Sequence, residues 1–172
     1  MRQVLAALVV AFWLTPIAGL LNAGLAAPVQ AGTPELDGTR PLTEPLVCLA
    51  RTIYFEARGQ SDEEMTAVGY VVVNRARHSE SPRDICAVIR EGGETPPCQF
   101  SWWCDGRSDV ATNRKEYDRA VRVARGVLDG TTADPTNGAN MFHNLSASPG
   151  WAREAEKRGR IGDQIFYYLA NR

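Results

Sequence analysis

The chain has 172 residues, of which 44% are hydrophobic and 23% charged, and its formal net charge is −1. This length fits one ordinary domain with short extensions. The near-neutral charge lacks the basic footprint of a nucleic-acid-binding protein, so we expect no nucleic-acid partner.

The N-terminal segment has the pattern of an export signal. Met1-Arg2-Gln3 is a short basic start, Val4 to Leu14 is an unbroken apolar run, and Val29-Gln30-Ala31 suits a cleavage site. We therefore expect a signal peptide over residues 1–31, a flexible leader over 32–45 and an exported protein, periplasmic or extracellular. Apolar character extends beyond the first run, so an uncleaved membrane anchor stays the alternative.

The segment from Leu46 to Ala57 predicts an amphipathic helix that stops at Gly59. Glu56 lies at the edge of its apolar face, partly out of water and at the negative end of the helix dipole. Both conditions favour the protonated carboxyl. Such a group can act as the general acid that cleaves a glycosidic bond. The alternative is a solvated glutamate near a helix end, paired with Arg58.

Caps predict further helices. Ser61-Asp62-Glu63-Glu64 is a capping box, in which Ser61 caps a helix from Asp62 to about Arg77 and Glu64 reaches back to the Ser61 amide. The Val71-Val72-Val73 run also suits a buried strand, but the cap and the length favour a helix.

Two later caps follow. Ser81-Pro82-Arg83-Asp84 starts a helix with Pro82 in the favoured first position and Gly92 as the stop. Asn113-Arg114-Lys115-Glu116 starts another, which carries an apolar face and ends at Asp129-Gly130.

The other segments are not helical patterns. Residues 92–112 read as a long loop, whereas 139–144 and 161–168 have the β-branched and aromatic content of strands and flank a short helix opened by Ser148-Pro149. The fold class expected is α+β, a mostly helical single domain with a small antiparallel β-ribbon.

The four cysteines are Cys48, Cys86, Cys98 and Cys104. An even number behind an export signal favours two disulfides. Cys98 and Cys104 flank one loop and are expected to pair, which leaves Cys48 with Cys86; the other pairings stay open. Neither zinc-ligand spacing nor a histidine cluster is present, so we expect no metal and no cofactor.

The loop from Cys98 to Gly106 carries adjacent tryptophans, Trp102 and Trp103. A long loop in a compact domain is typically functional. Flat aromatic faces and amide groups suit sugar rings. The alternative is a purely structural role, in which one tryptophan only fills the core.

Several short motifs follow one another along the chain: Leu49–Gly59, Ala67–Arg75, Cys98–Trp102, Met141–Asn144, Pro149–Trp151 and Ile161–Tyr167. Their order and spacing resemble the bacterial cell-wall hydrolase family of the spore cortex-lytic enzymes (SleB-like). The resemblance implies a lysozyme-like fold over residues 46–172. It also implies cleavage of the peptidoglycan glycan strand at the β-1,4 bond between N-acetylmuramic acid and N-acetylglucosamine. Family members often carry Glu where this chain has Gln60.

In this family the catalytic acid is the Glu of the Tyr-Phe-Glu-Ala-Arg-Gly segment, which is Glu56 here. A single acid/base carboxyl favours a lytic transglycosylase, because the 6-hydroxyl of the sugar itself replaces the second group that hydrolysis needs. Asp105, Asp109 and Asp163 are alternative second carboxylates. The residues expected to bind substrate are Asn74, Gln99, Phe100, Ser101, Trp102 and His143, with a helix-end hydrogen bond as the alternative for Asn74 and a structural role for His143.

Two rival functions stay open. One is an N-acetylmuramoyl-L-alanine amidase or another stem-peptide hydrolase. The other is a non-catalytic peptidoglycan-binding module, in which Glu56 is only structural. A monomer is the default expectation.

Overall fold

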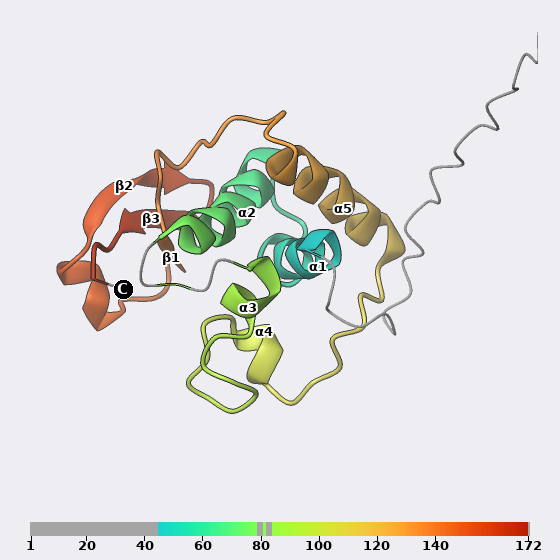
Figure 1. The fold of residues 1–172 in the computed structure, drawn as a ribbon, viewed down its shortest axis with the longest axis horizontal. Coiled ribbons are helices and arrows are strands. Elements are labelled where there is room, and N and C mark those ends of the chain that lie inside the picture. The colour runs from blue at the N-terminus through green and yellow to red at the C-terminus, as the bar shows by residue number, and fades with distance from the viewer. Residues whose placement is uncertain (1–44, 79–80, 82–83, 172) are drawn as a thin grey trace, which may run out of the picture. The chain divides into compact units, whose positions relative to one another are not determined.

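The computed structural model describes residues 45–78, 81 and 84–171. Helices are the main regular structure of this part, and a three-stranded antiparallel sheet completes it (Figure 1). The α+β class is therefore confirmed. The predicted signal peptide, and the leader up to residue 44, lie outside the described residues. Within the described part, no helix combines the length and apolar character that a membrane crossing requires.

The elements follow in chain order. The helices are α1 (Pro45–Ala57), α2 (Asp62–Arg77), α3 (Ile85–Ile89), α4 (Ser101–Cys104) and α5 (Arg114–Leu128). The C-terminal part holds strand β1 (Met141–Asn144), the 3₁₀ helix η1 (Gly150–Arg153), and strands β2 (Glu156–Ile161) and β3 (Gln164–Tyr168). The strand order in the sheet is β1-β3-β2.

The caps of α2 and α5 are as predicted. The Ser61 hydroxyl accepts from the Glu64 amide at 3.1 Å, and the Asn113 side chain accepts from the Glu116 amide at 3.2 Å. Each bond satisfies one of the free amides of a first helical turn. Gly59 ends the first helical segment with a φ of 83°.

The other half of the predicted capping box is wrong. The Glu64 side chain is buried and accepts from the backbone amide of Asp163 at 2.8 Å. Its partner lies in the turn between β2 and β3, far along the chain, so the carboxylate joins α2 to the sheet instead of closing its own helix.

The start of α3 also differs from the prediction. Asp84, and not Ser81, is the cap, because its side chain accepts from the Ala87 amide at 2.9 Å and the helix begins at Ile85. Pro82 lies outside the described residues. Aspartate and serine are both strong capping residues, so local sequence does not choose between them.

Two elements were not predicted. The one-turn helix α4 interrupts the expected loop 92–112, and β2 is an extra strand, so the expected ribbon becomes a three-stranded sheet. The sequence of β2 is Glu-Lys-Arg-Gly-Arg-Ile, which lacks apolar alternation. It lies at the sheet edge, where few of its side chains need burial.

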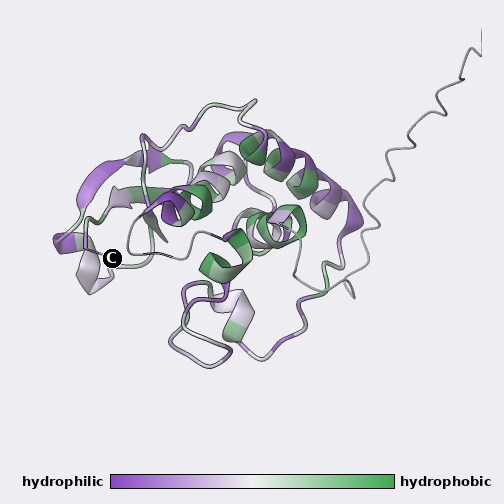
Figure 2. Ribbon diagram, in the orientation of Figure 1, coloured by the Kyte–Doolittle hydropathy of each residue, from purple (hydrophilic) through white to green (hydrophobic). Residues whose placement is uncertain are grey.

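Helix α2 lies between two apolar clusters. Met65, Val68 and Val72 pack with α1 and α5, whereas Ala67 and Val71 pack with Phe166 of the sheet. A helix buried on two faces is apolar nearly all round, which explains why its valine run also resembled a strand. Along α5, by contrast, apolar and polar stripes alternate (Figure 2).

Both expected disulfides are present. Cys48–Cys86 joins α1 to α3, and Cys98–Cys104 closes the segment that leads into α4. The second bond holds a short loop next to the end of α1, and this loop forms one wall of the candidate site.

Candidate active site

Glu56 lies one residue before the end of α1, and its side chain is only partly exposed. Burial raises the pKa of this carboxyl from its ordinary value of 4.5 to about 7, although the nearby positive charge of Arg75 opposes the shift. Burial disfavours the anion because the protein replaces water that would solvate it. The carboxyl is therefore half protonated near neutral pH.

Arg58 interacts with Tyr54. Its Nη1 donates to the Tyr54 hydroxyl at 3.0 Å, and its guanidinium carbon lies 5.2 Å from the centre of the same ring. Within the described part of the chain, no ion pair joins Arg58 to Glu56. The alternative of a solvated Glu56–Arg58 pair is therefore not what the structure shows.

Glu56 lines two cavities. The first, here called the loop cavity, has a volume of about 290 Å³ and extends towards the segment after α4. The second, the central cavity, has a volume of about 280 Å³ and extends towards the sheet. Ser101 also lines both, so the two cavities adjoin at Glu56 and Ser101.

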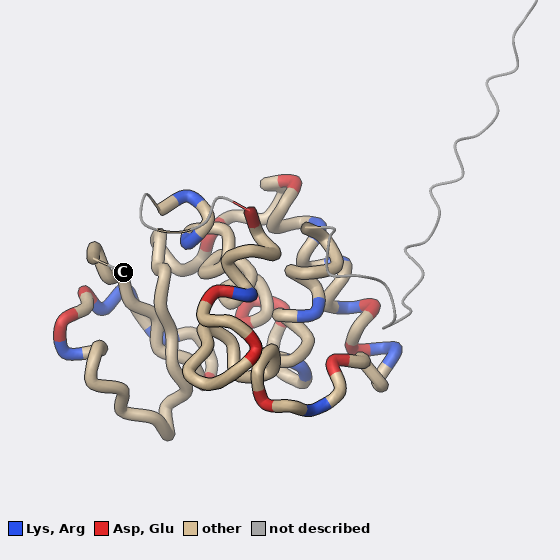
Figure 3. The backbone as a smooth tube through the Cα atoms, turned by 60° about the horizontal axis from the view of Figure 1, so that its bottom comes forward, with Lys and Arg blue, Asp and Glu red and all other residues tan. Residues whose placement is uncertain are grey.

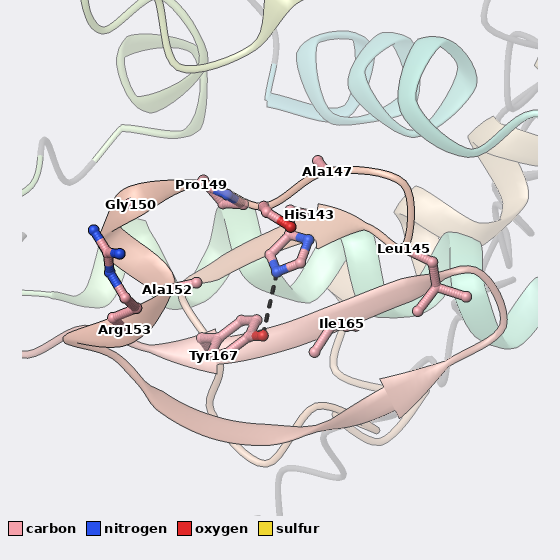
Figure 4. Close-up of a pocket in the computed structure, with 10 residues that line it drawn as sticks. His143, Leu145, Ala147, Pro149, Gly150, Ala152, Arg153, Ile165 and Tyr167 are labelled. Carbon is pink, nitrogen blue, oxygen red and sulfur yellow. Dashed lines mark hydrogen bonds between the residues drawn. The ribbon is translucent and has the colours of Figure 1, made fainter.

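A third cavity of about 500 Å³, the sheet cavity, lies over β1 and β3 (Figure 4). It shares His143 with the central cavity. Neighbouring cavities thus share lining residues, and we call the three together the groove, with Glu56 between the first two. The sheet cavity lies on the face of the sheet opposite Phe166, which packs on α2. An extended polymer with its scissile bond at Glu56 would have binding space on both sides.

Four of the predicted binding residues lie in this groove. Gln99 lines the central cavity, Ser101 lines the two cavities at Glu56, and Trp102 lines the loop cavity. His143 lines the central and sheet cavities, where its Nε2 lies 3.2 Å from the Tyr167 hydroxyl. Trp102 also stacks on Phe55, with 5.1 Å between the ring centroids. The segment from Cys98 to Gly106, here called the aromatic loop, is thereby anchored on the end of α1.

Two predicted residues do not line these cavities. Phe100 is 1% exposed and lies under the guanidinium of Arg75, which identifies it as a core residue. The Asn74 amide donates to the Asp134 carboxylate at 2.9 Å and to the Ala139 carbonyl at 3.0 Å. These bonds hold the segment between α5 and β1, so the Asn74 amide joins distant parts of the chain and does not make a hydrogen bond within the end of its own helix.

The sequence analysis did not single out Asn144 and Gln164 as site residues. They face each other in the β1–β3 register and line the central cavity with Glu56. Gln164 is 7% exposed, and its Oε1 has no hydrogen-bond partner among the described residues. A buried amide oxygen without a partner is costly, so a bound donor would stabilise it. The sequence feature that could have identified Gln164 is its position as a polar residue at the start of an apolar strand.

The three alternative second carboxylates lie in different parts of the structure. Asp105 and Asp109 line the loop cavity together with Glu56, whereas Asp163 lies in the turn that Glu64 holds. Burial raises the pKa of Asp109; Arg51 opposes this shift, and Asp105 and Glu94 add to it. Figure 3 shows where carboxylate and basic residues fall along the backbone.

The fold and the site define a lysozyme-like α+β domain in which a carboxyl with a pKa raised to about 7 lies between two adjoining cavities. The profile of the Cell Wall Hydrolase family matches residues 59–167, and the chain belongs to this family. The resemblance seen in the sequence is thereby confirmed.

The chain is similar to two spore cortex-lytic enzymes. The protein of Halalkalibacterium halodurans is 32% identical over 119 residues, which cover 69% of this chain and 33% of that protein. The protein of Oceanobacillus iheyensis is 27% identical over 137 residues, covering 78% of this chain and 46% of that protein. The chain therefore spans less than half the length of either relative.

Two solved structures share the fold. One is the catalytic domain of the germination-specific lytic transglycosylase SleB from Bacillus anthracis, with a TM-score of 0.59 and 26% identity, covering 72% of this chain and 93% of that one. The other is the catalytic domain of the Bacillus cereus SleB protein, with the same score and identity and 88% of its chain covered.

Proposed function

We propose that this protein cleaves the glycan strands of peptidoglycan at the β-1,4 bond between N-acetylmuramic acid and N-acetylglucosamine, as a lytic transglycosylase. The observation that carries the proposal is the position of Glu56, a carboxyl with a pKa of about 7 at the junction of two adjoining cavities. The lytic transglycosylase among the structural relatives supports it.

The reaction needs one carboxyl in two protonation states. Protonated Glu56 gives its proton to the glycosidic oxygen as the bond from that oxygen to the anomeric carbon breaks. The resulting carboxylate then takes the proton of the 6-hydroxyl of the same muramic acid, whose oxygen bonds to the anomeric carbon. The product is a 1,6-anhydro sugar, no water is consumed, and Glu56 regains its proton.

Polar groups of the central cavity would position the sugars. Their amides and hydroxyls suit the N-acetyl groups and ring hydroxyls of the glycan, and the unpartnered Gln164 Oε1 is available to accept a hydrogen bond from one of them. The residues proposed for this role are Gln99, Ser101, His143, Asn144 and Gln164. Trp102, stacked on Phe55, would form the wall on the other side of Glu56.

A second outcome is hydrolysis, and a specific observation favours it. Asp109 lines the same cavity as Glu56, so it could serve as the second carboxylate that activates water. The product distinguishes the two reactions. Anhydro-muramyl ends identify a transglycosylase, and reducing ends identify a hydrolase. If reducing ends are found, we expect the Asp109→Asn variant to lose the hydrolytic activity.

Digestion of purified peptidoglycan by wild type and Glu56→Gln tests the proposal. We expect anhydro ends from wild type and a loss of about a thousandfold or more in rate for the variant, because the amide cannot donate the proton. Glu63→Gln, a matched change at an exposed site on α2, should keep wild-type activity. Released stem peptides with intact glycan would identify an amidase, and binding without turnover a wall-binding module; either result contradicts the proposal.

A further inference from the structure

The sheet cavity is the largest of the three cavities in the groove, and its walls differ from those around Glu56. They are mainly small or aliphatic: Leu145, Ala147, Pro149, Ala152 and Ile165. Arg153 lies at one end of the cavity and Leu145 at the other, with His143 and Tyr167 between them (Figure 4). The cavity thus combines a row of methyl and methylene groups with a guanidinium.

The aromatic rings of this cavity are partly covered by one another. His143 and Tyr167 stack on each other with ring centroids 5.3 Å apart. Trp151 packs against both rings, at 5.7 Å from His143 and 5.5 Å from Tyr167. Because one face of His143 and one face of Tyr167 are turned towards each other, and Trp151 makes edge contacts with both rings, the cavity offers less of the flat surface that a sugar ring stacks on.

The charge of this face favours an anionic ligand. Arg153 is exposed and makes no ion pair within the described part of the chain. Lys157 pairs with Tyr167 in the β2–β3 register, so its side chain projects from the same face of the sheet. A guanidinium binds a carboxylate through paired N–H donors, with more specificity than a simple point charge.

We propose that the sheet cavity binds the stem peptide of peptidoglycan, with Arg153 holding one of its carboxylates and the aliphatic walls accepting its alanine methyl groups. The inference rests on the proposed function, because the stem peptide branches from the muramic acid of the strand bound at Glu56. His143, shared by the central and sheet cavities, marks the place where the peptide leaves the glycan.

The test compares two soluble substrates. One is uncrosslinked glycan strands that carry stem tetrapeptides, and the other is the same strands after an amidase has removed the peptides. The measured quantity is the ratio of kcat/KM for the first substrate to that for the second. We expect wild type to prefer peptide-bearing strands, and Arg153→Ala to lower the ratio about fivefold, as for the loss of one charge-assisted contact. Arg153→Lys should lower it less.

Arg122→Ala is the matched control, since Arg122 is an exposed arginine of α5 that lines none of the groove cavities. It should leave the ratio unchanged. A wild-type ratio near one overturns the proposal. So does an Arg153→Ala variant that loses activity equally on both substrates, because the cavity would then bind sugar.

A direct measurement separates this inference from the proposed function. The free stem tetrapeptide is titrated into ¹⁵N-labelled Glu56→Gln protein, and amide shifts are followed by NMR. Saturable shifts at Ala147, Ala152 and Arg153 support peptide binding in the sheet cavity. They do so even if wild type cleaves neither substrate, in which case only the proposed function is contradicted. Shifts absent from these residues overturn the inference.

Discussion

The raised pKa of Glu56 follows from the position of its side chain at the end of a helix. The carboxyl is shielded from water by α1, the aromatic loop and the sheet, and this shielding outweighs the attraction of Arg75. The net effect is a pKa near neutrality. A general acid works best at such a pKa, because it is protonated often and still gives up its proton readily.

The pH dependence of cleavage follows from this pKa. Since the free enzyme must carry the proton on Glu56, kcat/KM should fall as the pH rises through about 7. The decline should reach about tenfold per pH unit well above that value. Initial rates on soluble glycan strands between pH 4 and 9 measure it. A profile that stays flat up to pH 9 would exclude Glu56 as the acid.

The same pKa links stability to pH. The folded pKa of about 7 lies above the ordinary 4.5, so the fold favours the protonated carboxyl. This stabilisation is fully present below the unfolded pKa and is lost as the pH rises through the folded value. Glu56→Gln should therefore gain on the order of 2–3 kcal/mol relative to wild type between pH 4 and pH 8.

Urea unfolding of wild type, Glu56→Gln and the Glu63→Gln control at both pH values measures this difference. The control should shift little, because Glu63 is exposed. An equal effect of Glu56→Gln on the free energy of unfolding at pH 4 and pH 8 would show that folding does not raise the pKa of this carboxyl.

At the scale of elements, the contact between α2 and the β2–β3 turn places the sheet against the helices. The Glu64 carboxylate accepts from the Asp163 amide and lies against Gly162, which has a φ of 55°. A methyl group at position 162 would overlap the carboxylate. The turn directly precedes Gln164, so this contact also sets one wall of the central cavity.

Gly162→Ala and Gly138→Ala form a matched pair. Gly138 has a φ of 78° with open space around its Cα, so alanine there should cost only the backbone strain, about 1 kcal/mol. Gly162→Ala should cost roughly 1–3 kcal/mol more, because the buried Glu64 carboxylate must leave its hydrogen bond. Chemical denaturation checks both values. Equal losses would mean that the Glu64 contact adds nothing.

At the scale of the whole molecule, two disulfides divide their roles between stability and function. Cys48–Cys86 spans a sequence separation of 38 and Cys98–Cys104 one of 6. The longer loop restricts the unfolded chain more. Cys98 also lines the central cavity, so the shorter bridge bears on the site. Disulfides persist in oxidising compartments, which agrees with the predicted export.

Replacing each pair by serines tests this division. Loss of Cys48–Cys86 should cost about 4 kcal/mol of unfolding free energy and loss of Cys98–Cys104 about 2 kcal/mol. Cleavage should suffer more from the second change, because the loop that carries Gln99 and Ser101 is released. Denaturation and kcat/KM measure the two effects. If the order of the activity losses is reversed, the loop does not need its bridge to shape the groove.

Helix positions were predictable where caps are local. Ser61 and Asn113 each bond an amide three residues on, so the starts of α2 and α5 can be read from adjacent residues. The start of α3 was misplaced because two capping residues compete there, and β2 was missed because an edge strand needs no apolar pattern. The helix edge made Glu56 a candidate acid, the family resemblance assigned it that role, and its catalytic role stays a prediction.

The sequence alone determined the α+β class, the caps of α2 and α5, and the position of Glu56 at the end of a half-apolar helix, because these depend on neighbours within one or two turns. Only the tertiary structure decided that α2 is buried on two faces. It also placed Ser101, His143 and Gln164 around the same cavity as Glu56 and left Phe100 and Asn74 out of the groove. The reason is physical: desolvation and cavity shape are set by every group within contact distance, and most of those groups are far away in the chain.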